Sequence, residues 1–240
     1  MKQKLDEKQM VTVLDELYGK VLNGIPKVSK PVDALANDYL LKNNSPKKAA
    51  KELTKYQIAK CGTSGFITGL GGIITLPVAI PANVSSVLYV QLRMVAAIAY
   101  MGDFDIQSDQ VQTLAYACLT GSAIADVLKQ TGIKVGEKIA ISAINKVPGK
   151  VLTSINQKVG FRLITRFGTK GAVNLVKLVP VAGGIIGGAI DIGSTNIIAR
   201  NAYTIFIKKE MPSDAPNKST PKGEEIPIVE SDINSTDFIK

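Results

Sequence analysis

The sequence CGTSGFITGLGGIITLPVAIPANVSSVLYVQL, Cys61–Leu92, is a run of 32 residues without a single charge. Pro77 and Pro81 divide it into two apolar stretches. The first stretch, Gly62–Leu76, has only 15 residues, five of them glycine, whereas a helix needs about 20 apolar residues to span a bilayer. Its length therefore predicts a buried or re-entrant helix that closes at the prolines.

The second stretch continues beyond the run as ANVSSVLYVQLRMVAAIAYMG, residues 82–102, which predicts a helix with Asn83 placed to cap its start. Arg93 lies in the middle of this helix. An arginine at the centre of a bilayer costs roughly 2.5–3.5 kcal/mol. We therefore expect this helix in a protein core, with Arg93 either paired or reaching a surface.

Glycines recur at four-residue spacing in the first stretch and again in VPVAGGIIGGAID, residues 179–191. Because a glycine inside a helix costs roughly 1 kcal/mol relative to alanine, these glycines need an explanation. Close packing of helix backbones or conformational lability would supply one. The glycines predicted to pack closely are Gly65, Gly69, Gly183, Gly184, Gly187 and Gly188.

A set of polar residues is predicted to lie inside the protein. Asp191 shares a helix face with the second group of glycines, and we expect it to pair a core arginine such as Arg93 or Arg200. An ion or proton site at Asp191 is the alternative. The candidate buried polar residues are Arg93, Asp126, Asp191 and Arg200.

The net charge of +9 is concentrated in one part of the 240-residue chain. The net charge of successive blocks is +5 for 1–60, −2 for 61–132, +8 for 133–177, +1 for 178–211 and −3 for 212–240. The basic block predicts short helices with an apolar opposite side, a pattern that suits an anionic membrane surface. The residues predicted to contact a membrane or a partner are Lys134, Lys138, Lys146, Lys150, Lys158, Arg162, Arg166 and Lys170.

Nucleic acid is the competing partner for so basic a block, since the sequence pI is about 9.4. Phe161 and Phe167 are the only aromatic residues between positions 133 and 177, however, and no stacking platform or known DNA-binding motif is present. The residues therefore favour a membrane surface over nucleic acid.

The residue types present exclude several classes of chemistry. The chain has no histidine, so a Ser-His-Asp triad, a Cys-His pair and a His-ligated zinc are all ruled out. Its two cysteines, Cys61 and Cys118, form no CxxC motif, and neither a phosphate-binding P-loop nor a GxSxG elbow occurs. Asp103, Asp105 and Asp109 lack the glycine and glutamate of a calcium loop. No catalytic residue, metal or cofactor is predicted.

The two ends of the chain differ in character. Apolar residues at helical spacing over 10–22 predict an amphipathic helix, and the charges among residues 6–16 interrupt any export signal. We therefore expect a cytoplasmic protein with free thiols. Residues 212–240 are acidic, with four prolines, which predicts a disordered tail. This tail either has no partner or forms a short docking segment from Ile226, Ile228, Val229, Ile233 and Phe238.

Several motifs together resemble the EcsC family. They are NGIP at 23–26, SGFITGLGGIITLPVAIP at 64–81, YVQLRMVAAIAYMGDFDIQSDQVQTLAYACLTGSA at 89–123 and LVPVAGGIIGGAID at 178–191. The resemblance covers about residues 10–210, with Asn83 standing where the family usually has an acidic residue. It implies a bacterial, mostly helical protein, often encoded near an ABC transporter, and it supplies no catalytic residues.

The sequence as a whole predicts an all-α domain over 1–211, a multi-helix bundle around glycine-rich apolar helices, followed by the tail 212–240. The predicted function is non-enzymatic binding to the inner membrane surface, to a membrane partner such as an ABC transporter, or to both. Two alternatives remain open. One is a membrane-perturbing effector in which residues 62–81 insert. The other is an enzyme or binder of a lipid or other apolar ligand between the glycine helices, with Asp191, Arg93 or Asp126 as its polar groups.

Overall fold

The computed structural model describes residues 5–62, 76, 80–167 and 183–213, excepting the side chains of 60–62, 82–83 and 183–192. Over these residues the regular structure is helical, with two isolated β-bridges, and the all-α prediction is confirmed. The elements are α1 (Glu7–Asn23), α2 (Val32–Lys42), α3 (Pro46–Gly62), α5 (Ala82–Met101), α6 (Asp109–Cys118), the 3₁₀ turn η1 (Gly121–Ala123), α7 (Ile124–Lys129), α8 (Ile141–Ile144), α9 (Gly149–Phe167), α11 (Gly183–Ala202) and the π-helical turn η2 (Tyr203–Ile207). The glycine-rich stretch 63–75, with Gly65 and Gly69, lies outside the described residues.

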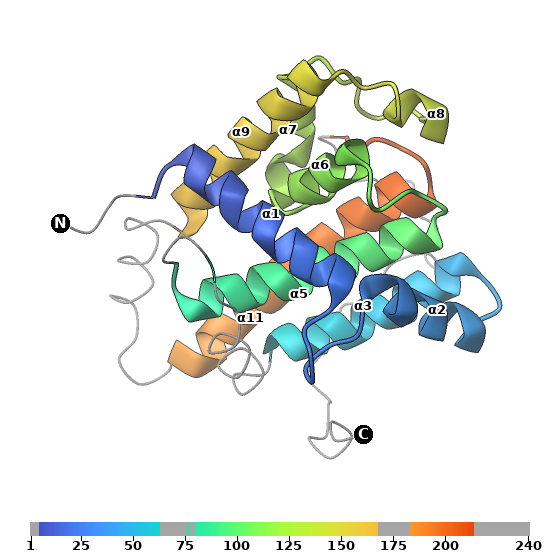
Figure 1. The fold of residues 1–240 in the computed structure, drawn as a ribbon, viewed down its shortest axis with the longest axis vertical. Coiled ribbons are helices and arrows are strands. Elements are labelled where there is room, and N and C mark those ends of the chain that lie inside the picture. Colours follow the sequence, from blue (N-terminus) through green and yellow to red (C-terminus); the bar gives the residue numbers. More distant parts are fainter. Residues whose placement is uncertain (1–4, 63–75, 77–79, 168–182, 214–240) are drawn as a thin grey trace.

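Helix α5 crosses the middle of the molecule and is covered by α1, α2, α3, α6, α11 and η2 (Figure 1). By length and composition Val84–Met101 could cross a membrane, the one such helix in the described chain, but 94% of it is buried inside the protein. The prediction that this helix lies in a protein core is therefore confirmed. Pro81, not Asn83, occupies its N-cap position; proline suits a helix start because its ring fixes φ and the missing N–H would have no helical partner there.

Helix α1 buries the apolar face that the sequence predicts. Its start is closed by a capping box, in which Asp6 accepts a hydrogen bond of 2.8 Å from the Gln9 N–H and the Gln9 side chain accepts one of 3.0 Å from the Asp6 N–H. The buried residues of the helix are Met10, Val13, Leu14, Leu17, Tyr18 and Val21. This face packs on α5 and α9.

Two tyrosines join α1 to α6. The rings of Tyr18 and Tyr116 meet edge to face, with their centroids 5.8 Å apart. The Tyr116 hydroxyl donates to Asp15 Oδ1 at 2.8 Å, and the Tyr18 hydroxyl donates to the Ile106 carbonyl at 2.9 Å. Burial raises the pKa of both phenols well above their usual value, and the nearby carboxylates of Asp15 and Asp105 raise it further.

Two glycines outside the predicted set allow backbones to meet. A Cβ on Gly160 of α9 would lie 2.8 Å from the carbonyl oxygen of Glu7, at the start of α1. A Cβ on Gly102, just after α5, would lie 2.1 Å from the carbonyl oxygen of Phe206 in η2. Both obstacles are main-chain atoms, which cannot rotate aside as a side chain can. The α1–α9 contact and the α5–η2 contact therefore each require glycine.

We expect Gly160→Ala to lower the free energy of unfolding by about 1–3 kcal/mol, the usual cost of overpacking a tight contact. Gly19→Ala is the matched control, because Gly19 is also inside a helix, but beyond that helix's own backbone no atom of the described chain lies within 4 Å of its Cβ position. This control should raise stability by roughly 0.5–1 kcal/mol through helix propensity alone. Urea denaturation measures the free energy of unfolding of both variants. Equal changes of this free energy in the same direction would contradict the close contact.

We expect the free energy of unfolding to fall as the pH rises above 10. The unfolded chain then releases the Tyr116 proton, which the folded protein retains because the folded-state pKa is raised. The loss is up to about 1.4 kcal/mol per pH unit for one proton. In Tyr116→Phe the free energy of unfolding should fall less steeply between pH 10 and 11, because the contribution of this proton is absent. A variant with the same slope as the unsubstituted protein would show that the phenol ionises freely in the folded state.

Candidate functional site

The loop Ile25–Pro31 between α1 and α2 is hydrogen-bonded to α5 at two points. Within the loop, Ile25 and Ser29 exchange backbone hydrogen bonds of 2.9 Å, and Gly24 before it has the positive φ of 75° that this turn requires. The hydroxyl of Ser29 shares a hydrogen bond of 2.6 Å with that of Tyr89 on α5. One helical turn later, Arg93 Nη2 donates to the Lys30 carbonyl at 2.7 Å.

Arg93 is buried, as predicted, and only 7% of its surface is exposed. Its described oxygen partner is the Lys30 carbonyl, and its Nε atom has no hydrogen-bond partner within the described chain. Burial lowers its pKa, an effect that Tyr89 and Tyr39 partly offset. Arg93 therefore holds the loop against α5. The predicted pairing of Arg93 with Asp191 involves a side chain that lies outside the described residues.

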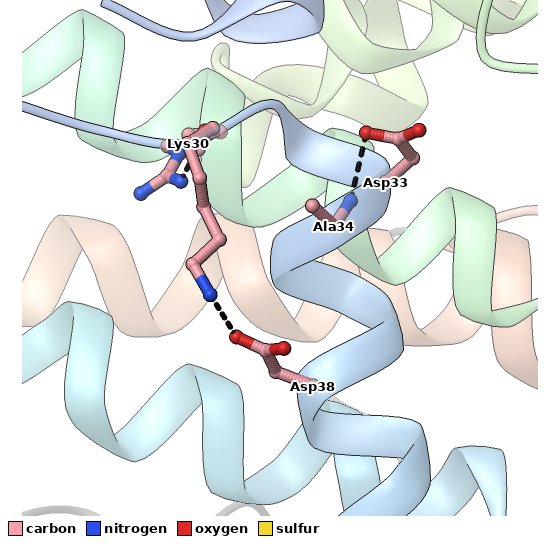
Figure 2. Close-up of polar contacts among 5 residues, drawn as sticks. Lys30, Asp33, Ala34 and Asp38 are labelled. Carbon is pink, nitrogen blue, oxygen red and sulfur yellow. Dashed lines mark hydrogen bonds and ion pairs between the residues drawn. The ribbon is translucent and has the colours of Figure 1, made fainter. Parts of the chain in front are cut away.

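The surface above this anchor carries an exposed ion pair. Figure 2 shows the Lys30 amine pointing at the carboxylate of Asp38 on α2, with Asp33 accepting a hydrogen bond of 2.7 Å from the Ala34 N–H at the start of that helix. The hydrogen bond from Lys30 lowers the pKa of Asp38. The pair lies at the surface, where such bridges contribute little to stability.

Two of the other predicted buried residues are exposed. Asp126 lies on α7 between the buried residues Ala125 and Val127, and it occupies the outward side of that short helix. Arg200 lies on the solvent side of α11, nearly one turn after Ile197, whose surface is 41% exposed. The prediction of burial is therefore wrong for both residues, and neither lines an interior pocket.

The interior polar contacts that the structure does contain were not predicted. Gln91 of α5 donates to the Thr195 hydroxyl of α11 at 3.0 Å, and Asn201 donates to the Gly121 carbonyl at 2.8 Å. Thr54 Oγ1 and Gln57 Nε2 of α3 are buried without a hydrogen-bond partner among the described residues. These uncharged groups were missed because single amides and hydroxyls within a helix give no distinctive spacing.

The predicted contact residues that are described all belong to the segment 134–166, which contains α8 and most of α9 (Figure 1), and we call them together the basic flank. The exposed ones are Lys134, Lys138, Lys146, Lys150 and Arg162, and the half-buried ones are Lys158 and Arg166. Lys158 donates to Gln130 Oε1 at 3.0 Å, and the Arg166 guanidinium lies 5.0 Å from the centroid of the Phe167 ring. Lys170 lies outside the described residues.

The outer side of α9 combines positive charge with an exposed aromatic ring. Phe161 is 55% exposed, and it shares this side with Lys150, Lys158 and Arg162, which we call together the α9 basic surface. An open groove of about 530 Å³ runs beside it, lined by Glu7, Val127, Gln130, Ser154, Gln157, Lys158, Phe161 and Arg162. The inner side of the same helix buries Leu152, Ile155, Val159 and Leu163. In the folded protein α9 is therefore amphipathic, and its apolar side is buried in the core.

The exposed position of Phe161 was not predicted. The basic residues around it were identified from their charge, but whether a phenylalanine points inward or outward depends on which side of α9 meets α1 and α6. Its place on the helix gave a usable signal, because Phe161 lies on the same side of the helix as Lys150 and Lys158 rather than in line with Ile155 and Val159.

We expect Phe161→Ser to change the free energy of unfolding by no more than about 0.5 kcal/mol, as is usual for surface substitutions. Ile155→Ala, a truncation on the buried side of the same helix, should cost about 2–5 kcal/mol. Thermal and urea denaturation compare the two variants. A loss of more than 2 kcal/mol in Phe161→Ser would mean that the ring belongs to the core, and it would remove Phe161 from the candidate surface.

No protein-family model matches the chain, and no curated protein and no solved structure matches it. The candidate surface therefore rests on the residues of this chain alone.

Proposed function

We propose that this is a non-enzymatic, membrane-associated cytoplasmic protein that binds the anionic inner membrane surface through the α9 basic surface. The observation that carries the proposal is the exposure of Phe161 among Lys150, Lys158 and Arg162 on a helix whose other side is held by the core. Each cation near an anionic bilayer contributes about 1 kcal/mol of attraction. A phenylalanine beside such cations adds apolar contact at the headgroup boundary.

The rest of the basic flank extends this surface. Lys134, Lys138 and Lys146 are exposed in the segment that leads from α7 through α8 to α9. Such charges attract an anionic surface without needing a fixed partner, and the attraction weakens with salt. The proposed mode is therefore peripheral and electrostatic, with α5 remaining in the core.

A membrane transporter is a further partner in this proposal. The support is the resemblance of residues 23–26, 64–81, 89–123 and 178–191 to the EcsC family, whose members are often encoded near an ABC transporter. Membership in that family is itself part of the proposal. Membrane binding through α9 would concentrate the protein beside such a partner.

The test is flotation of the protein with phosphatidylcholine vesicles that contain or lack phosphatidylserine. Lys150→Gln/Arg162→Gln should weaken binding to the anionic vesicles about 30-fold, since two cations contribute about 2 kcal/mol. Lys47→Gln/Lys48→Gln is the matched control, because it also removes two exposed bases, at the start of α3 on the opposite side of the view from α9 (Figure 1).

The control variant should bind within about twofold of the unsubstituted protein, because its changes lie away from the contact surface. Equal losses in the two double variants would show that only total charge matters and would contradict the proposed surface. Failure of the unsubstituted protein to bind either kind of vesicle, at low or high salt, would contradict membrane binding itself.

A further inference from the structure

The described chain ends beside the basic flank. Residues 209–211 run along the segment 136–139: the Met211 N–H donates to the Glu137 carbonyl at 2.9 Å, the Gly136 N–H to the Met211 carbonyl at 3.0 Å and the Ile139 N–H to the Lys209 carbonyl at 2.8 Å. Lys138 and Glu210 form an antiparallel bridge. Whatever follows Ser213 therefore starts next to Lys134 and Lys138.

The same end of the chain also lies against α9. Met211 lines a small apolar cavity of about 20 Å³ together with Leu152 and Ile155 of that helix. Phe161 is six residues after Ile155, or about 9 Å further along the helix axis at 1.5 Å per residue. Along the helix axis the contact of Met211 therefore lies within about two turns of Phe161, with Met211 on the inner side of α9 and Phe161 on the outer side.

The sequence that follows is complementary to this surface in charge and in apolar character. The segment EEIPIVESD, Glu224–Asp232, carries four carboxylates around Ile226, Ile228 and Val229. The groove beside α9 offers Lys158 and Arg162 to carboxylates and the exposed ring of Phe161 to apolar side chains, with Glu7 as the one carboxylate among its lining residues. Ten residues, 214–223, separate Ser213 from this segment, and ten extended residues reach at most about 33–36 Å.

We propose that Glu224–Asp232 docks in the groove beside α9 and competes there with the anionic membrane. The competition rests on the proposed membrane binding and deepens it. The docking itself does not depend on membranes. A tether of this length holds the segment at an effective concentration on the order of 1 mM, so that an intrinsic Kd of about 0.1 mM gives about tenfold competition. The tail thus sets how strongly the basic surface attracts a membrane.

Zero-length carbodiimide coupling of the full chain, mapped by mass spectrometry, tests the docking without membranes. Carboxylates of Glu224, Glu225, Glu230 and Asp232 should couple to Lys150 and Lys158 in preference to the exposed Lys47 and Lys48. Phe161→Ser should reduce this coupling several-fold. Coupling spread evenly over the four lysines, or unchanged in Phe161→Ser, would overturn the docking.

Vesicle flotation of the full chain tests the competition. Glu224→Gln/Glu225→Gln/Glu230→Gln/Asp232→Asn should bind phosphatidylserine-containing vesicles about tenfold more tightly than the unsubstituted protein. Equal binding of the two would overturn the competition. If neither binds while the carbodiimide products remain, the proposed membrane function is wrong and the docking stands.

Discussion

The fold depends on the burial of α5 on every side. A helix that is apolar all round is stable in water only if other elements cover each of its sides, and six of them do so here. The cover is close enough that Gly102 at the end of α5 meets the backbone of η2. Most of the remaining architecture follows from this requirement, because α1, α2, α3 and α11 each direct an apolar face toward the same helix.

Arg93 shows how the protein accommodates a charge in this core. Its guanidinium crosses from α5 to the loop before α2 and donates to a main-chain carbonyl there, while Tyr89 binds the same loop one turn earlier. A buried arginine is costly unless its donors find oxygen atoms. Here the arginine fixes a loop, which is a structural role.

The sequence was sufficient for the all-α class, for the burial of α5 and for the buried side of α1, but not for particular neighbours. The uncharged run and the position of Arg93 predicted a buried helix, and the spacing of residues 10–22 predicted the buried side of α1. The partner of Arg93 could not be predicted, because a backbone carbonyl distant in sequence has no side-chain signature. Gly160 was missed for a similar reason, since the oxygen that requires it belongs to Glu7 of another helix. The expected interior roles of Asp126 and Arg200 failed because each lies on the outward side of its helix.

Hydrogen–deuterium exchange with phosphatidylserine-containing vesicles distinguishes the proposed binding, in which α9 meets the membrane and α5 stays in the core, from insertion of α5. For the proposed binding we expect exchange in 149–167 to slow when vesicles are added, while exchange in 84–101 stays slow and unchanged. Altered exchange in 84–101, with none in 149–167, would contradict it and would indicate that the central helix leaves the core to insert.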